Sequence, residues 1–137
     1  MPAIYEHRLT VGTTSIDRQG HANNVEFVRW MQEAAIAHSD AQGFDAERYS
    51  AIGGTWFVRS HHIEYLAPAL EGEEVIVRTW VASVDKVRSR RRYRFERAGQ
   101  LLAQAETEWV WIDHGRGGPR PVPAEVAAAF EVVDDPC

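Results

Sequence analysis

The chain has 137 residues and a single cysteine, Cys137, at its last position. One cysteine cannot form an internal disulfide or a cysteine-rich zinc site, and its terminal place argues against a buried cysteine nucleophile. No apolar run approaches the length of a membrane span, and the opening residues MPAIYEHRLT lack the apolar core of a secretory signal peptide. These absences predict a cytoplasmic protein without a membrane span.

An excess of positive charge is also absent. The chain has 15 Lys and Arg against 20 Asp and Glu, which gives a formal net charge of −5. Domains that bind nucleic acids are normally basic, so no nucleic-acid partner is expected. Apolar residues make up 45% of the chain, enough to bury a core, and residues 1–137 are predicted to form a single domain.

The clearest predicted element is a long helix that begins after Asn23. Apolar residues recur at three- and four-residue steps over 27–38, which gives the helix one apolar face. Asn23 is a good N-cap, Glu26 stands where it could complete a capping box, and Gly43 is a natural stop. Three further apolar residues predict a helix that is buried around most of its circumference: Trp30, Ile36 and Ala37.

Strand patterns lie on both sides of this helix. Strands are predicted over 4–11, 55–65, 74–84, 87–97 and 101–112, and a short helix over 124–131. The connections between the last three strands are short, which favours antiparallel hairpins. The predicted fold class is therefore α+β. One long helix cannot cover both faces of a five-stranded sheet, so a face or an edge is left for solvent or a partner.

The polar loop before the helix carries the candidate chemistry. If the Asn23 side chain caps an amide two or three residues later, the Asn24 N–H stays free at the positive end of the helix. A free amide there can polarise a carbonyl oxygen. A nearby carboxylate such as Asp17 can then attack the carbonyl or activate a water. An aspartate in a polar loop is more often a turn former, so spacing alone does not identify a catalyst.

The same loop resembles the opening of a known family. The segment Ser15-Ile16-Asp17-Arg18-Gln19-Gly20-His21-Ala22-Asn23-Asn24, followed by Phe27-Val28-Arg29-Trp30, resembles the 4-hydroxybenzoyl-CoA thioesterase family of hotdog-fold proteins. The likeness continues through residues 63–69, 71–73, 111–113 and 120–123, so it covers nearly the whole chain. It implies a long central helix wrapped by a curved five-stranded antiparallel sheet, paired edge to edge into a homodimer. Dimers of this family often combine into a homotetramer.

The resemblance also implies hydrolysis of an acyl-CoA or acyl-carrier-protein thioester, with no cofactor. Asp17 matches the family's catalytic acid, acting as nucleophile or general base. The amide of Asn24 matches the group that polarises the thioester carbonyl. A non-catalytic acyl-CoA-binding module, in which Asp17 is only a hydrogen-bond acceptor in the loop, is the alternative from a different class.

Four further side chains are candidates for contact with the substrate. Three lie around the loop: His21, Asn23 and Phe27, although His21 is favoured as a residue that holds the loop in shape. The fourth, Trp56, follows Gly53-Gly54, and glycines there would let a substrate approach the backbone beside an acyl pocket.

A cluster of seven basic residues lies between 86 and 97 in an otherwise acidic chain. On a strand, Arg88, Arg90 and Arg92 share one face and Arg91 lies on the other. The cluster could be a solvated surface that discourages aggregation. The resemblance favours a surface for the phosphates of CoA, with four candidates: Arg88, Arg90, Arg91 and Arg92.

The remaining candidates are interpreted as structural. His38 lies on the apolar face of the helix and is expected to be a satisfied core histidine. His61 and His62 are neighbours on a strand and must point to opposite faces, so they cannot form a metal site together. Glu33, on the helix, is also ranked as structural because Asp17 is present. No metal site is expected.

Overall fold

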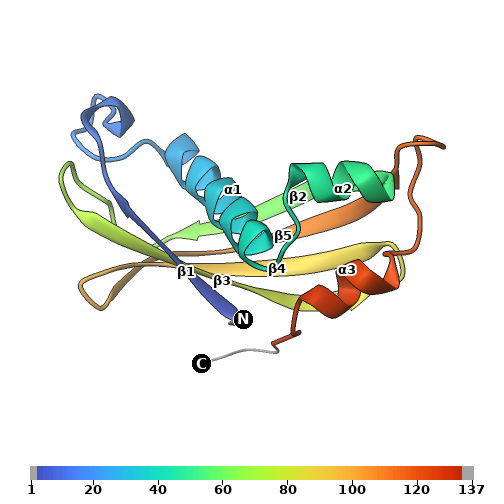
Figure 1. Cartoon of the computed structure of the whole chain (residues 1–137). Coiled ribbons are helices and arrows are strands. Elements are labelled where there is room, and N and C mark those ends of the chain that lie inside the picture. Colours follow the sequence, from blue (N-terminus) through green and yellow to red (C-terminus); the bar gives the residue numbers. More distant parts are fainter. Residues whose placement is uncertain (1–2, 134–137) are drawn as a thin grey trace.

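The structure, a computed structural model, describes residues 3–133. Its elements are β1 (Ile4–Thr10), the short 3-10 helix η1 (Thr13–Ser15), α1 (Asn24–Ala41), α2 (Ala46–Ile52), β2 (Gly54–Tyr65), β3 (Glu74–Asp85), β4 (Arg88–Arg97), β5 (Gln100–Asp113) and α3 (Ala124–Ala129). Figure 1 shows α1 lying across one face of a curved sheet, with α2 and α3 toward one end of it. The predicted α+β class is confirmed.

The five strands form one antiparallel sheet in the order β1-β3-β4-β5-β2. The β4–β5 hairpin is closed by Ala98 and Gly99, with φ of 48° and 84°. Two successive positive φ values give the turn whose twist matches the strands on either side of it. The predicted strands are confirmed with small changes at their ends. In the part of the chain that the structure describes, β1 and β2 are the two edges.

One face of α1 packs on the sheet. Its buried residues include Phe27, Met31 and Ala34, which join a core with Val77 of β3 and Phe95 of β4. The prediction that α1 is buried around most of its circumference is wrong, because Ile36 is 59% exposed. The sheet covers only one side of the helix, so the apolar residues on its outer side remain accessible.

The start of α1 is capped in part as predicted. The Asn23 side chain accepts a hydrogen bond from the Val25 N–H at 2.9 Å. The capping box is wrong: the Glu26 carboxylate accepts from the Ser15 hydroxyl at 2.6 Å, and the Asn23 N–H donates to the Ser15 carbonyl at 2.9 Å. The segment η1 therefore holds the beginning of the helix. At the other end, Gly43 follows the helix with φ of 90°, as a stop requires.

The helix α2 has no counterpart in the sequence prediction. It spans seven residues, too few for an apolar period to stand out, although Asp45 caps it by accepting from the Arg48 N–H at 2.8 Å. Its Tyr49 joins a second apolar cluster with Phe44, Trp111 and Val126. This cluster lies at the end of the sheet where α2 and α3 meet it (Figure 1).

Candidate active site

The loop that carries Asp17 is a tight turn closed by the backbone. The Asp17 N–H donates to the His21 carbonyl at 3.0 Å, and the Gly20 N–H donates to the Asp17 carbonyl at 3.1 Å. The Asp17 side chain is half-buried and accepts the Gln19 N–H on Oδ1 at 2.8 Å. Within residues 3–133, Oδ2 has no hydrogen bond. Asp17 thus stabilises a turn with one carboxylate oxygen, and the other oxygen stays available to a further donor or a reacting group.

The start of α1 offers the second group of this candidate site. Because the Asn23 side chain takes the Val25 N–H and the Asn23 carbonyl takes the Glu26 N–H, the Asn24 N–H has no acceptor among the described residues. The Asn24 carbonyl accepts from the Tyr65 hydroxyl at 3.2 Å, which ties the helix start to the end of β2. A donor without an acceptor at a positive helix end can bind an oxygen that gains negative charge.

Two residues predicted to contact the substrate, His21 and Phe27, also make contacts within the protein. The His21 backbone carbonyl closes the Asp17 turn, and the role of its side chain stays a prediction. Phe27 is only 2% exposed, and its ring lies 5.1 Å from that of Phe95 and 5.3 Å from that of Tyr65. The Phe27 ring fills the core between helix and sheet, and its contact with a substrate stays a prediction.

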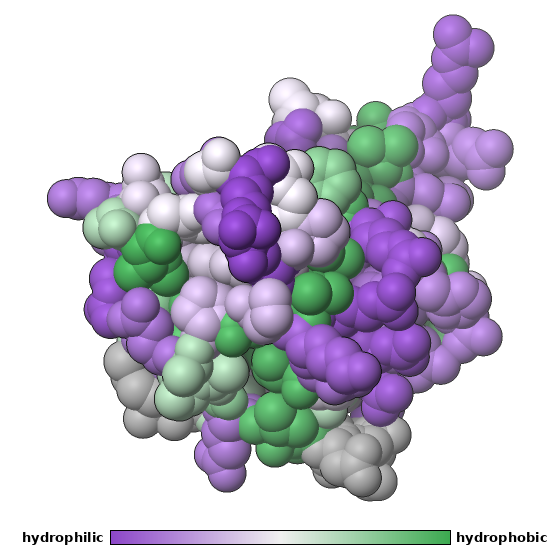
Figure 2. Space-filling view, turned by 90° about the vertical axis from the view of Figure 1, so that its right-hand side faces the viewer, coloured by the Kyte–Doolittle hydropathy of each residue, from purple (hydrophilic) through white to green (hydrophobic). Residues whose placement is uncertain are grey.

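A cavity of about 440 Å³ opens between one flank of α1, the first half of β2, and α3. Its lining is mainly apolar and includes Trp56, Val58, Trp109 and Phe130, with the exposed Ile36 and Phe57 at the rim. The volume falls in the range of small-molecule sites. Figure 2 shows the end of the molecule that carries α2 and α3, where apolar residues interrupt a polar surface.

Trp56 lines this cavity. The two glycines before it are explained by the packing and the backbone of the protein itself. A Cβ on Gly54 would lie 2.5 Å from the indole of Trp111, so that indole, and no substrate, occupies the space that the glycine leaves. Gly53 has a φ of 82° and ends α2. The space beside Gly54 is therefore filled by the protein itself, whereas, apart from its chain neighbours, no atom of the described residues lies within 4 Å of a Cβ placed on Gly53. The contact of Trp56 with a substrate stays a prediction.

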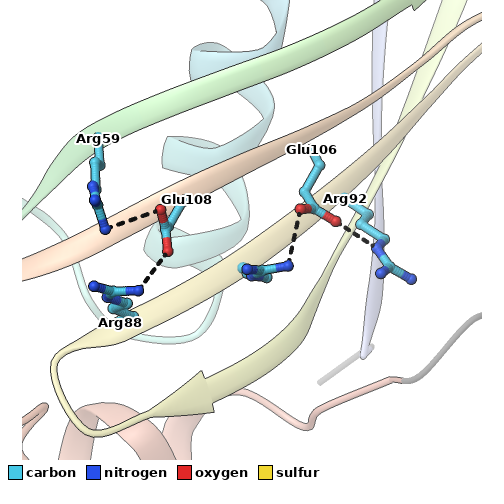
Figure 3. Close-up of polar contacts among 6 residues, drawn as sticks. Arg59, Arg88, Arg92, Glu106 and Glu108 are labelled. Atoms are coloured by element: carbon cyan, nitrogen blue, oxygen red, sulfur yellow. Dashed lines mark hydrogen bonds and ion pairs between the residues drawn. The ribbon is translucent and has the colours of Figure 1, made fainter.

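The alternation predicted for the basic strand is present in β4. Arg88, Arg90 and Arg92 lie on the outer face of the sheet, where two glutamates of β5 pair with them. Glu108 lies 3.5 Å from both Arg59 and Arg88, and Glu106 lies 3.6 Å from Arg90 and 3.0 Å from Arg92 (Figure 3). Each glutamate is shared by two arginines, so each group of three keeps one net positive charge.

Arg91 does not belong to this outer surface. It is only 5% exposed and lies on the inner face, where its Nη1 contacts His38 Nδ1 at 2.9 Å and donates to Thr79 Oγ1 at 3.0 Å. The sequence prediction grouped Arg91 with the three outer arginines as a phosphate contact, and the sheet separates them. His38 is buried and bonded, as expected of a core histidine.

The other histidines of interest behave as interpreted. His61 contacts Thr107 Oγ1 through Nδ1 at 2.8 Å, and burial lowers the pKa of His61. His62 is exposed on the opposite face. Among residues 3–133, no three His, Cys, Asp or Glu side chains lie close enough to hold a metal ion, and no helix is long and apolar enough to cross a membrane.

Comparison with known proteins adds to this geometry. A family model described as the thioesterase-like superfamily matches residues 11–130. A 1,4-dihydroxy-2-naphthoyl-CoA thioesterase from Synechocystis is 21% identical, with a TM-score of 0.86 over 97% of this chain and 99% of its own. A gentisyl-coenzyme A thioesterase is 21% identical, with a TM-score of 0.81 over 93% and 99% of the two chains.

A further similar structure, of a Staphylococcus aureus protein, was determined in complex with CoA. It is 16% identical, with a TM-score of 0.87 over 92% of this chain and 80% of its own. A search of curated proteins finds no match. The structural likenesses confirm the hotdog arrangement of helix and sheet.

Proposed function

Because the chain belongs to the thioesterase-like superfamily, we propose that it hydrolyses acyl-CoA thioesters with Asp17 and the Asn24 amide. The observation that carries this proposal is the helix N-terminus, where the Asn24 N–H lacks an acceptor among the described residues. The half-buried Asp17 precedes it on a closed turn and keeps one carboxylate oxygen unbonded in the same part of the chain. An amide donor and a carboxylate are the two groups that acyl transfer from a thioester needs.

Two routes use these groups. In the nucleophilic route, an Asp17 oxygen bonds to the acyl carbon, the carbon–sulfur bond breaks, CoA leaves as a thiolate, and water then hydrolyses the anhydride. In the general-base route, Asp17 takes a proton from water as the hydroxyl adds to the carbon, and the proton passes to the leaving sulfur. In both, the Asn24 N–H donates to the carbonyl oxygen as its negative charge grows.

We infer that the working unit is a homodimer formed through β2. This strand is a long free edge of the described sheet, and exposed edges invite pairing with another strand. Large exposed apolar residues lie along it and on the facing side of α1: Val25, Ile36, Phe57, Tyr65 and Leu66. Pairing of two β2 edges would bury this surface and bring the Asp17 loop of one copy toward the cavity of the other. Association of dimers into a homotetramer would leave this pairing intact.

We assign the phosphates of CoA to the outer face of β4. Arg88, Arg90 and Arg92 hold more positive charge than Glu106 and Glu108 neutralise, and arginine forks fit phosphate oxygens well. The protein determined with CoA, which shares the fold, supports CoA as the carrier of the acyl group. Asn23 serves this site by capping α1, which keeps the Asn24 amide free.

The proposal is tested by thiol release from aromatic and aliphatic acyl-CoA esters, measured with a chromogenic disulfide. Matched esters of acyl-carrier protein and of N-acetylcysteamine, which lacks phosphates, carry the same acyl groups. We expect hydrolysis of CoA esters, with a higher KM for the N-acetylcysteamine esters. Release from carrier-protein esters alone would move the substrate to that protein. Release from none of these esters would overturn the proposal and favour a binding module.

A further inference from the structure

The cavity beside α1 contains a buried charge that the described residues do not neutralise. Arg91 lines this cavity and is only 5% exposed. Within residues 3–133, no Asp or Glu oxygen lies within ion-pair distance of its guanidinium. Burial lowers the pKa of Arg91, yet arginine stays protonated in proteins. A buried positive charge is costly unless a negative charge meets it.

Within residues 3–133, the side-chain hydrogen bonds of Arg91 involve only one of its three guanidinium nitrogens, Nη1. Nη1 contacts His38 Nδ1 and donates to Thr79 Oγ1, and no hydrogen bond of Nε or Nη2 is present among the described residues. The ring of Phe130, which also lines the cavity, lies 5.8 Å from the guanidinium carbon. These contacts fix the side chain in place and leave a donor pair for an oxygen anion.

The side chains around Arg91 determine which kind of ligand could reach it. Arg91 pairs with Val81 on β3 and with Thr107 on β5, and its contact with His38 places its side chain beneath α1. The exposed Ile36 and Phe57 line the same cavity, whose other lining side chains are mainly apolar. The acid at this site, Asp40, is exposed and forms no ion pair in the described part of the chain. The cavity is thus an apolar passage with a cation at its inner wall.

We propose that this cavity binds a hydrocarbon chain or ring that ends in a carboxylate, which pairs with Arg91. Two N–H groups of a guanidinium match the two oxygens of a carboxylate. Applied to the proposed function, on which this step rests, the preferred acyl group carries a carboxylate at the end far from the thioester. Arg91 is then a residue that determines specificity, with no part in breaking the carbon–sulfur bond.

The binding claim is tested without hydrolysis. Octanoate and octanamide have the same chain and differ in charge, and Trp56 and Trp109 line the cavity, so tryptophan fluorescence reports occupancy. We expect octanoate to bind at least about tenfold more tightly than octanamide, the discrimination that one charge-assisted hydrogen bond supplies. Arg91→Gln should remove this preference, and Arg91→Lys should keep part of it. Equal affinities in the wild type would overturn the proposal even if Arg91→Gln does not fold.

A carboxylate of the chain itself is the competing partner, because Asp134 and Asp135 follow Val133 in sequence and the Val133 N–H donates to the Val81 carbonyl. The double variant D134N/D135N separates the two cases. If octanoate is preferred only in that variant, the chain's own acids occupy Arg91 and the proposal is wrong. If the wild type and the double variant show the same preference, the proposal holds.

Hydrolysis of the mono-CoA ester of octanedioic acid, compared with octanoyl-CoA, tests the extension to substrates. We expect the first to have the higher kcat/KM in the wild type and the order to reverse in Arg91→Gln. Octanoate binding that depends on Arg91, without hydrolysis of any ester, would refute the proposed activity and leave the carboxylate site standing. Hydrolysis without any preference for carboxylate would refute the site alone.

Discussion

Asp17 shows how one residue could combine a structural role with the catalytic role that we propose for it. Its Oδ1 accepts the Gln19 N–H and its backbone closes the turn with His21, so the carboxylate is held by the loop that it helps to form. The sequence alone favoured a turn former at this position, and the turn is present. The unbonded Oδ2 is what makes the catalytic interpretation compatible with it. A side chain held by one oxygen is positioned for reaction through the other.

Ser15 connects this loop to helix α1, and replacing its side chain should lower the stability of the protein. Its buried hydroxyl donates to the Glu26 carboxylate at 2.6 Å. Ser15→Ala leaves a buried carboxylate oxygen without a donor, so we expect the free energy of unfolding to fall by about 1–3 kcal/mol. Chemical denaturation measures it. Ser50→Ala, at an exposed position of α2, is the control and should change stability by less than about 0.5 kcal/mol. A Ser15→Ala variant as stable as the control would contradict this.

Glu73 should make stability depend on acid. Burial raises the pKa of this carboxyl, but hydrogen bonds from the Leu70 N–H and from Arg97, together with the Arg97 charge, lower it more, so its pKa is lowered overall. A carboxylate with a depressed folded pKa stabilises the protein above its unfolded pKa, and this stabilisation is lost as pH falls through the folded value.

The comparison of the wild type with Glu73→Gln measures this effect. We expect the wild type to be more stable at pH 7, by less than about 1 kcal/mol, because water still reaches both side chains of the half-buried Glu73–Arg97 pair. The difference should shrink as pH falls below about 4, near the ordinary glutamate pKa. Denaturation at a series of pH values provides the test. A difference that stays constant from pH 7 to pH 3 would show that the Glu73 charge is not responsible.

At the scale of elements, the hairpins illustrate what local sequence can predict. The β4–β5 turn was expected from its length and glycine, and it has positive φ at both central residues. Ala98 is a poor residue for its φ of 48°, since a β-carbon disfavours this region. Ala98→Asn should therefore raise the free energy of unfolding by about 0.5–1 kcal/mol, measured by thermal or chemical denaturation. Gly99→Ala should do the opposite, and a stabilising Gly99→Ala would contradict this interpretation.

The elements that sequence patterns missed are those set by distant contacts. Helix α2 is too short for a period, and its Tyr49 is placed by Phe44 and Trp111, which come from other segments. The capping box failed because η1 supplied the donor that Glu26 needed, an interaction across eleven positions in sequence. The predicted burial of α1 around most of its circumference was wrong for a similar reason. The position of the sheet determines which side of the helix is covered, and this position is not encoded in the helix's own sequence.

The candidate site shows the same difference between features that local sequence predicts and features that distant contacts determine. Alternation along β4 correctly separated Arg91 from Arg88, Arg90 and Arg92, but it could not reveal that Arg91 meets His38 and borders a cavity. That contact joins α1 to the sheet, and no spacing in the sequence encodes it. The sequence did contain one indication of an unusual polar core: Arg91 falls at an inward position of its strand, and His38 falls on the apolar face of the helix.

At the scale of the whole molecule, the β2 edge should govern assembly. Phe57 lies on this edge strand and is 63% exposed. Phe57→Lys places a charge where two β2 strands would meet, so we expect a dimeric wild type and a monomeric variant in analytical ultracentrifugation. Val132→Lys, at an exposed apolar residue outside β2, should remain dimeric. A monomeric wild type, or a dimeric Phe57→Lys variant, would contradict pairing through β2.

The measurement that tests the central claim most directly is the rate of thiol release from the best acyl-CoA ester by Asp17→Asn. The asparagine oxygen can still accept the Gln19 N–H, so the turn should survive while the carboxylate is lost. Asp45→Asn, at the cap of α2, makes the same chemical change outside the site. We predict that kcat falls by about 10²-fold or more in Asp17→Asn and by less than about twofold in Asp45→Asn. A folded Asp17→Asn variant that keeps the wild-type rate would show that Asp17 does not carry the reaction.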